Sequence, residues 1–363
     1  MQKKHFFWIV PALILFLSLF CAEIYLRAQA TQIINAKQNG RFLLESNPEF
    51  LIQHTPKGKR LIPYAEVLIK NHQLGHRDIP IRINSNGFRG EELRIKTTDE
   101  FRILVLGDSI TWGDYLFEDE IFHSFLDAHT LSNGQKIRVM NAGVGDIGIE
   151  EMVDIYFEQF NSVQPDMVLL NLYLNDSRPP WGFPEEISQR GWLRRYLRIA
   201  EFLYKRVRLY QWIEEKGAHR FAWVSLQSTL DWKHNQEDFQ TLVQAAQYDW
   251  GAGWQPESSA LVSLYIEKLH LHTKSQQIPL LATILPVAYQ VHAEFLNDTP
   301  QQMLNKSLAS FSIPTLDFLP LLRNNAHEKL YYDQCHPNPH GNAIMGSALK
   351  EFVLSQASKT PSY

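Results

Sequence analysis

The sequence contains few cysteines and little net charge, and each shortage excludes a class of protein. Only two of the 363 residues are cysteine, and Cys21 and Cys335 stand far apart in very different surroundings. This pair predicts neither a disulfide framework nor a cysteine-based metal site. The net charge is −4, whereas binding to nucleic acid needs a strongly basic face. We therefore expect no nucleic-acid partner.

Long uncharged hydrophobic runs are also scarce, and the clearest one, 6–22, lies near the amino terminus. It is about the shortest length that crosses a bilayer, and the lysines before it favour a cytoplasmic start. The Ala-Gln-Ala at 28–30 is typical of a signal-peptidase site. A cleavage region carrying Glu23 and Arg27 would be unusually long and charged, so we favour an uncleaved membrane anchor over residues 1–30. With an anchor the remaining chain is periplasmic; with a cleaved signal peptide it is secreted.

From residue 101 onward, short apolar runs alternate with amphipathic segments. The runs lie at 102–106, 136–140, 166–174, 278–285 and 313–317. Helical patterns such as 150–160 and 260–273 separate them. Apolar runs joined by helices indicate a parallel sheet that is covered on both faces. We therefore predict an α/β fold over 101–355, a three-layer sandwich around a mostly parallel central sheet of about five strands.

Two regions lie outside this alternation. Residues 31–100 form an extended leader with strand-like pieces at 61–69 and 79–84. Residues 178–277 are rich in tryptophan and poor in strand signals, which indicates a helical insertion or cap. Within this region, 191–215 combines an apolar stripe with a basic face. We favour a surface helix that packs on the main domain; contact with anionic lipid or an acidic glycan is the alternative.

The first apolar run ends at a Gly-Asp turn followed by Ser109. Such a turn is either ordinary chain reversal or a rigid support for a nucleophile. A serine hydroxyl needs a general base, which is itself oriented by a third group. Asp333 and His336 are three residues apart, so the carboxylate can reach the Nδ1 hydrogen and leave Nε2 for Ser109. His340 is a rival base without an acid at comparable spacing.

Two further strand ends carry hydrogen-bond donors. A glycine-containing turn at 139–148 follows the second run, and Asn175 follows the third. Each signal alone is typical of a turn or a helix cap. Because the carboxyl ends of parallel strands share one edge of the sheet, these donors are expected to lie near the nucleophile. Acyl chemistry needs such donors for the developing oxyanion.

Together these blocks resemble the SGNH (GDSL-type) hydrolase superfamily, which has a Gly-Asp-Ser turn, a glycine turn, an Asn-Asp turn and an Asp-x-x-His-Pro loop in this order. The resemblance covers about 101–355 and, with the amino-terminal segment, looks like a membrane-tethered bacterial member. It implies a flavodoxin-like sheet, with Ser109 as nucleophile, His336 as base and Asp333 as its orienting acid. The implied oxyanion hole consists of the Ser109 backbone N–H, a glycine N–H and the Asn175 amide.

The chain departs from the family pattern at several positions. Its glycine block is one residue short, so we choose Gly145 as the glycine donor, ahead of Gly143. Tyr173 stands where the family often has glycine, which leaves Asn175 in place and predicts a narrower pocket. Thr111 replaces the second glycine of a Gly-x-Ser-x-Gly pattern, which disfavours the nucleophile elbow of α/β-hydrolases.

The leading functional prediction is an extracytoplasmic serine esterase that hydrolyses an acyl ester or an acylated saccharide through an acyl-enzyme. The close alternative is an O-acyltransferase that uses the same residues but passes the acyl group to a sugar hydroxyl of a cell-surface polysaccharide. The second alternative is a catalytically silent glycan-binding or assembly protein. The presence of Ser109, Asp333 and His336 disfavours this last interpretation.

We expect no cofactor and no metal. No cluster of His, Asp and Glu has the spacing of a metal site, which disfavours a metallo-esterase. Cys335 lies inside the Asp-x-x-His loop. We interpret it as a small packing residue, with a redox role as the alternative.

Overall fold

The computed structural model describes residues 3–38, 43–45, 51–180, 182–183, 197, 199, 202 and 220–357. The amphipathic segment predicted at 191–215 lies, apart from three isolated positions, outside the described residues. The chain divides into two units. One comprises Met1–Arg41 with Phe183–His219, and the other comprises Phe42–Gly182 with Arg220–Tyr363.

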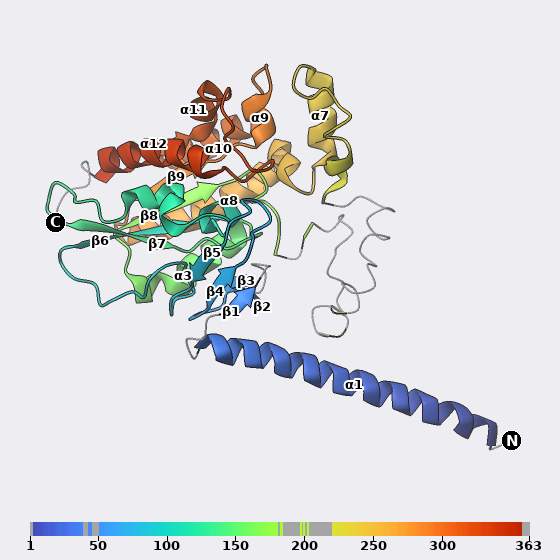
Figure 1. Ribbon diagram of the computed structural model, residues 1–363. Coiled ribbons are helices and arrows are strands. Elements are labelled where there is room, and N and C mark those ends of the chain that lie inside the picture. The colour runs from blue at the N-terminus through green and yellow to red at the C-terminus, as the bar shows by residue number, and fades with distance from the viewer. Residues whose placement is uncertain are drawn as a thin grey trace. The chain divides into compact units, whose positions relative to one another are not determined.

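The described part of the first unit consists mainly of one long helix, α1 (Lys3–Gln38), drawn in blue in Figure 1. Its segment Val10–Ala28 is long and apolar enough to cross a membrane, and its side chains are largely exposed. Glu23 and Arg27 form an ion pair at 2.6 Å on this helix. A signal sequence near the amino terminus can also be long and apolar enough, so the helix is compatible with both a membrane anchor and a cleaved signal peptide.

A five-stranded sheet forms the centre of the second unit. Its strands are β6 (Glu100–Leu106), β7 (Lys136–Asn141), β8 (Met167–Leu172), β9 (Leu280–Ile284) and β10 (Thr315–Asp317). Their order is β10-β9-β8-β6-β7, and every neighbouring pair is parallel. This is the flavodoxin-like order, in which the first strand, β6, lies second from one edge and the strand order reverses after the edge strand β7. Each of the five predicted runs overlaps one of these strands, so the predicted fold class is confirmed.

Alternate side chains of the strands enter two hydrophobic cores, one on each face of the sheet. In β6, Leu104 and Leu106 belong to the first core, whereas Ile103 and Val105 belong to the second. The first core lies under α3 (Ile149–Val163), α8 (Pro256–Ser275) and α10 (Thr299–Ser310), and the second under α11 (Phe318–Asn324), α12 (Pro339–Ala357) and the 3₁₀ helix η3 (Phe122–Leu126). Figure 1 shows α12 and α3 on opposite sides of the sheet. These are the predicted three layers.

Short strands precede the main sheet. They are β1 (Leu43–Glu45), β2 (Ile52–Thr55), β3 (Gly58–Leu61), β4 (Glu66–Ile69) and β5 (Ile79–Arg82). The strand-like pieces predicted from the sequence contain β4 and β5, which pair in antiparallel fashion. Leu61, Ile69 and Ile79 are fully buried and join the first core, so this segment packs against the main sheet. The domain boundary at residue 100 remains a prediction.

The region 178–277 is helical where the structure describes it. It contains η4 (Ala222–Ser225), α7 (Gln236–Ala245), η5 (Trp250–Trp254) and α8. Trp223 and Trp250 are buried in the second core and stand edge to face, with ring centroids 6.0 Å apart. Both side chains therefore contribute to packing rather than to an open sugar-binding surface.

Because the sheet is buried on both faces, we expect truncation of Ile103 to destabilise the protein. Ile103→Ala removes a side chain that is 0% exposed and should cost about 2–5 kcal/mol of unfolding free energy. Ile95→Ala is the matched control, because Ile95 is 92% exposed and its truncation should change stability by less than about 0.5 kcal/mol. Urea unfolding measures both variants. Equal losses of unfolding free energy in Ile103→Ala and Ile95→Ala would contradict burial of the sheet on both faces.

Candidate active site

Ser109 lies at the start of a short helix that follows β6, an inner strand of the sheet between β7 and β8. Strand β6 ends at Leu106, and α2 (Ser109–Trp112) begins two residues after Gly107. The Asp108 carboxylate caps this helix by accepting a hydrogen bond of 2.9 Å from the Ile110 backbone N–H. Gly107 has no room for a side chain, because a Cβ there would collide with Thr111. The turn therefore places Ser109 at the carboxyl edge of the sheet.

The structure brings Ser109, His336 and Asp333 together. Ser109 Oγ lies 3.0 Å from His336 Nε2, although the two residues are 227 positions apart in the chain. On the other side of the ring, His336 Nδ1 lies 2.8 Å from Asp333 Oδ2. The hydroxyl, the imidazole and the carboxylate therefore form one continuous hydrogen-bonded chain, in the order that a nucleophile, its base and an orienting acid require.

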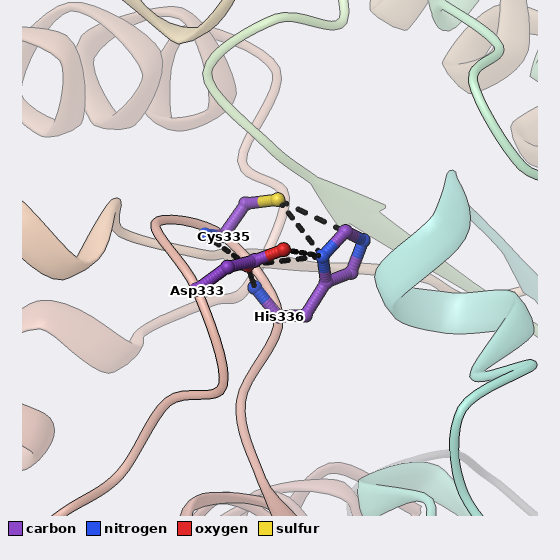
Figure 2. A group of neighbouring side chains, drawn as sticks. All are labelled: Asp333, Cys335 and His336. Atoms are coloured by element: carbon purple, nitrogen blue, oxygen red, sulfur yellow. Dashed lines mark hydrogen bonds and ion pairs between the residues drawn. The ribbon is translucent and has the colours of Figure 1, made fainter. Parts of the chain in front are cut away.

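The loop before α12 holds His336 in this position. Asp333 Oδ1 accepts backbone hydrogen bonds from Cys335 (2.9 Å) and His336 (2.8 Å), which closes the Asp-x-x-His turn. The ring of Tyr115 packs edge-on against the His336 ring, with centroids 4.9 Å apart. Figure 2 shows the Asp333 carboxylate and the Cys335 sulfur both directed at the Nδ1 side of the imidazole. The backbone bonds and the aromatic contact thus fix both the loop and the ring.

Electrostatics favour a charged Asp333 and a basic His336. Burial by itself lowers the pKa of His336, but the Asp333 carboxylate outweighs this effect and raises that pKa above its ordinary value. Burial likewise raises the pKa of Asp333, but hydrogen bonds from His336 and the loop backbone outweigh it and leave that pKa below its ordinary value. Each group stabilises the charged form of the other, which suits an imidazole that accepts a proton.

The predicted oxyanion donors lie at the ends of the neighbouring strands. The glycine turn packs on the serine turn through a hydrogen bond of 3.2 Å from the Val144 N–H to the Gly107 carbonyl. The Gly143 N–H already donates to Asn141 Oδ1 at 3.0 Å. The Gly145 N–H has no acceptor among the described residues, which favours Gly145 as the glycine donor. Asn175 follows β8 and directs Nδ2 toward Asp249 at 3.4 Å.

Three other residues singled out in the sequence lie outside the hydrogen-bonded series of Ser109, His336 and Asp333. His340, the rival base, pairs with Glu328 and is half exposed. Tyr173 is buried in the second core. Cys335 packs partly against that core, and its Sγ lies 3.2 Å from His336 Nδ1. The structure thus favours His336 over His340, and packing is one role that Cys335 fulfils.

Asp333, Cys335 and His336 also form a group whose ligand atoms lie within 4.8 Å of one another, as a metal site would require. The group fits a metal poorly, because Asp333 is occupied by the imidazole and by two backbone N–H groups. Burial and the Asp333 charge raise the pKa of the Cys335 thiol well above its ordinary value. A protonated thiol is a poor metal ligand.

A set of charged residues around the donors could not be recognised from the sequence. Arg220 pairs with Asp146, which directly follows Gly145, and its Nε lies 3.2 Å from Asp249 Oδ1. Lys59 pairs with the same Asp146 carboxylate. Arg220 and Asp249 belong to the insertion and stand in no recognisable motif, so only their contacts identify them.

Two further buried carboxyl groups, in the serine turn and in the Asn-Asp turn, have raised pKa values, in contrast to Asp333. Asp108 is 3% exposed and Asp176 1% exposed. Burial raises the pKa of Asp108 to about 6, and burial together with the Asp108 charge raises the pKa of Asp176 well above its ordinary value. The Tyr173 N–H donates to Asp176 at 2.8 Å. Burial and the neighbouring Asp108 charge thus favour the neutral form of Asp176.

No protein-family model and no curated protein matches the chain. Among solved structures, it is similar to one assigned as a lipolytic protein of the G-D-S-L family from Desulfitobacterium hafniense, with 13% identity and a TM-score of 0.37 over 69% of this chain and 98% of that one. A mutant of an acetylxylan esterase from Geobacillus stearothermophilus matches with 13% identity and a TM-score of 0.39, over 72% and 96%. A GDSL-like lipase from Bacteroides thetaiotaomicron matches with 16% identity and a TM-score of 0.37, over 73% and 93%.

The opposed environments of two histidines predict distinct titrations. His336 should titrate above pH 6.5 because of Asp333, whereas burial lowers the pKa of His123 to about 4 and should keep its ring neutral. In Asp333→Asn the pKa of His336 should fall, since the substitution removes the strongest effect that opposes burial. Histidine-labelled NMR titration measures these values, with His336→Gln assigning the resonance. An unchanged His336 pKa in Asp333→Asn would refute the proposed electrostatic coupling.

Proposed function

We propose that this chain is a serine esterase of the SGNH (GDSL) type, which hydrolyses an acyl ester through Ser109, His336 and Asp333. One observation carries the proposal: the continuous chain of hydrogen bonds from Asp333 through His336 to Ser109, with heavy-atom distances of 2.8 and 3.0 Å. These hydrogen bonds lead to Ser109 at the carboxyl edge of a parallel sheet, where such folds bind their ligands.

In the first half-reaction, Ser109 Oγ attacks the ester carbonyl carbon while His336 Nε2 accepts the hydroxyl proton. The carbonyl oxygen becomes an oxyanion that the Ser109 N–H, the Gly145 N–H and the Asn175 amide stabilise. The tetrahedral species then collapses. The bond between carbon and the alcohol oxygen breaks, His336 returns the proton to the leaving alcohol, and the acyl group remains on Ser109.

In the second half-reaction, a water molecule attacks the acyl carbon and His336 accepts its proton. Collapse releases the carboxylic acid, and the proton returns to Ser109 Oγ. Asp333 keeps its negative charge throughout, holds the Nδ1 hydrogen and stabilises the imidazolium that forms in each half-reaction. The lowered pKa of Asp333 supports this role.

We further propose that the reaction takes place outside the cytoplasm. The apolar segment Val10–Ala28 of α1 supports this location, and the lysines before it favour a cytoplasmic amino-terminal end. The substrate is then an acyl ester or an acylated saccharide outside the cytoplasm. We retain the division into an anchor over 1–30 and a catalytic domain over 101–355 as part of this proposal.

Loss of the nucleophile should abolish turnover of a chromogenic short-chain ester by the full-length protein in detergent. Ser109→Ala should lower kcat by about 10³-fold or more, because no other group can form the acyl-enzyme. Ser347→Ala is the control, since Ser347 is an exposed serine on α12 and its loss should leave kcat unchanged. Wild-type turnover in Ser109→Ala would rule out the proposed nucleophile.

A sugar acceptor separates hydrolysis from acyl transfer. With the same ester and a soluble oligosaccharide, an esterase should release acid and alcohol in equal amounts, and mass spectrometry should find no acylated sugar. Accumulation of acylated sugar at the expense of free acid would instead identify an O-acyltransferase. Absence of turnover with every ester tested would favour a catalytically silent glycan-binding protein.

A further inference from the structure

The side-chain amide of Asn175 depends on one partner. Its Nδ2 lies 3.4 Å from Asp249 Oδ1, while its Oδ1 is buried and has no partner among the described residues. A carboxylate only accepts hydrogen bonds, so Asp249 requires the NH₂ group rather than the amide oxygen to face it. One amide hydrogen then points to Asp249, and the other remains available for a substrate oxygen.

Asp249 is itself firmly held. It is 4% exposed, and it accepts hydrogen bonds of 3.2 Å from Arg220 Nε and from Trp223 Nε1. All three residues belong to the described part of the insertion at 178–277. The insertion therefore supplies a rigid acceptor to a donor that stands at the end of strand β8.

A carboxylate close to a developing oxyanion would destabilise the oxyanion by charge repulsion unless the carboxylate is neutralised. Arg220 provides this neutralisation, because its guanidinium contacts both Asp249 and Asp146. Asp146 also pairs with Lys59, so two cations face two carboxylates. The side chain of Arg220 is 14% exposed, which limits screening of these ion pairs by solvent.

Arg220 also connects the two segments that carry the predicted oxyanion donors Gly145 and Asn175. Asp146 directly follows Gly145 and adopts a left-handed backbone conformation, with φ of 58°. This conformation is uncommon for a residue other than glycine. The ion pairs with Lys59 and Arg220 hold Asp146 in place. One guanidinium thus contacts the segment that presents the Gly145 N–H and, through Asp249, the Asn175 amide.

We propose that Asp249 is a positioning residue that orients the Asn175 amide as an oxyanion donor, and that Arg220 neutralises Asp249 and ties it to the glycine turn. This inference rests on the proposed function, and it gives the insertion a role in the reaction. Asp249 acts through Asn175 and does not itself contact the reacting atoms.

A double-mutant cycle on the full-length protein tests the proposal with a chromogenic ester. Asn175→Ala should lower kcat by about 10²-fold, as loss of one oxyanion donor does. Asp249→Ala should lower kcat by about tenfold or more, because a misplaced group loses much of its effect, while KM changes less than about threefold. In the Asn175→Ala background, Asp249→Ala should cause no further loss of kcat.

Asp166→Asn is the matched control. Asp166 also combines an ion pair, at 2.6 Å to Lys96, with a hydrogen bond, at 2.7 Å from the Arg102 N–H, but it precedes β8 and lies at the opposite edge of the sheet. The kcat of Asp166→Asn should match the wild-type value. If Asp249→Ala does not fold, Asp249→Asn replaces it, with a smaller loss of kcat that again vanishes without the Asn175 amide.

The outcomes separate this inference from the proposed function. Equal fold-losses from Asp249→Ala with and without Asn175 would show that Asp249 supports the fold and not the amide, and would overturn the inference. An unchanged kcat in both Asp249 variants would overturn it as well. If Ser109→Ala abolishes turnover in either case, the proposed function stands; if Ser109→Ala retains turnover, the proposed function itself fails.

Discussion

The hydrogen bond between Ser109 Oγ and His336 Nε2 is the interaction on which the account of this molecule depends. It joins the end of the inner strand β6 to the loop just before α12, over a separation of 227 residues. Neither side chain is placed by local structure alone. The parallel sheet brings its carboxyl ends to one edge, and the second core anchors α12 beneath the histidine loop. Loss of the sheet would therefore separate the two groups.

Buried charge around this hydrogen bond follows a consistent pattern. The carboxylates with a lowered pKa form ion pairs: Asp333 pairs with His336, and Asp146 pairs with Lys59 and Arg220. Asp176 forms no ion pair among the described residues, and its pKa is raised although it accepts a hydrogen bond from the Tyr173 N–H. Burying an unpaired charge is costly, so this distribution lets an apolar sheet edge hold several acids near a site where negative charge develops.

Much of the fold could be predicted because its signals are local. The five apolar runs predicted all five strands of the main sheet. Asp333 and His336 could be paired from their spacing, since a single turn closes that contact. These features depend on neighbouring residues in the sequence, where periodicity and turn chemistry are informative.

The rest depends on contacts that the sequence does not encode locally. Arg220 and Asp249 have no motif, and they reach Asp146 and Asn175 across separations of 74 residues in each case. Further support for Gly145 over Gly143 likewise comes from a contact, the hydrogen bond that the Gly143 N–H donates to Asn141 Oδ1. The packing of the strands before residue 100 on the first core was also not evident, because short strands with mixed burial give weak periodicity.

The central claim is that the Ser109 hydroxyl is a nucleophile activated by His336. Its most direct test is covalent labelling of the full-length protein with a fluorophosphonate, which forms a stable bond to an activated serine and releases fluoride. Peptide mass spectrometry should find the phosphonyl group on Ser109 in the wild-type protein, and His336→Gln should strongly slow its attachment. An unlabelled Ser109, or labelling at the same rate without His336, would contradict the account.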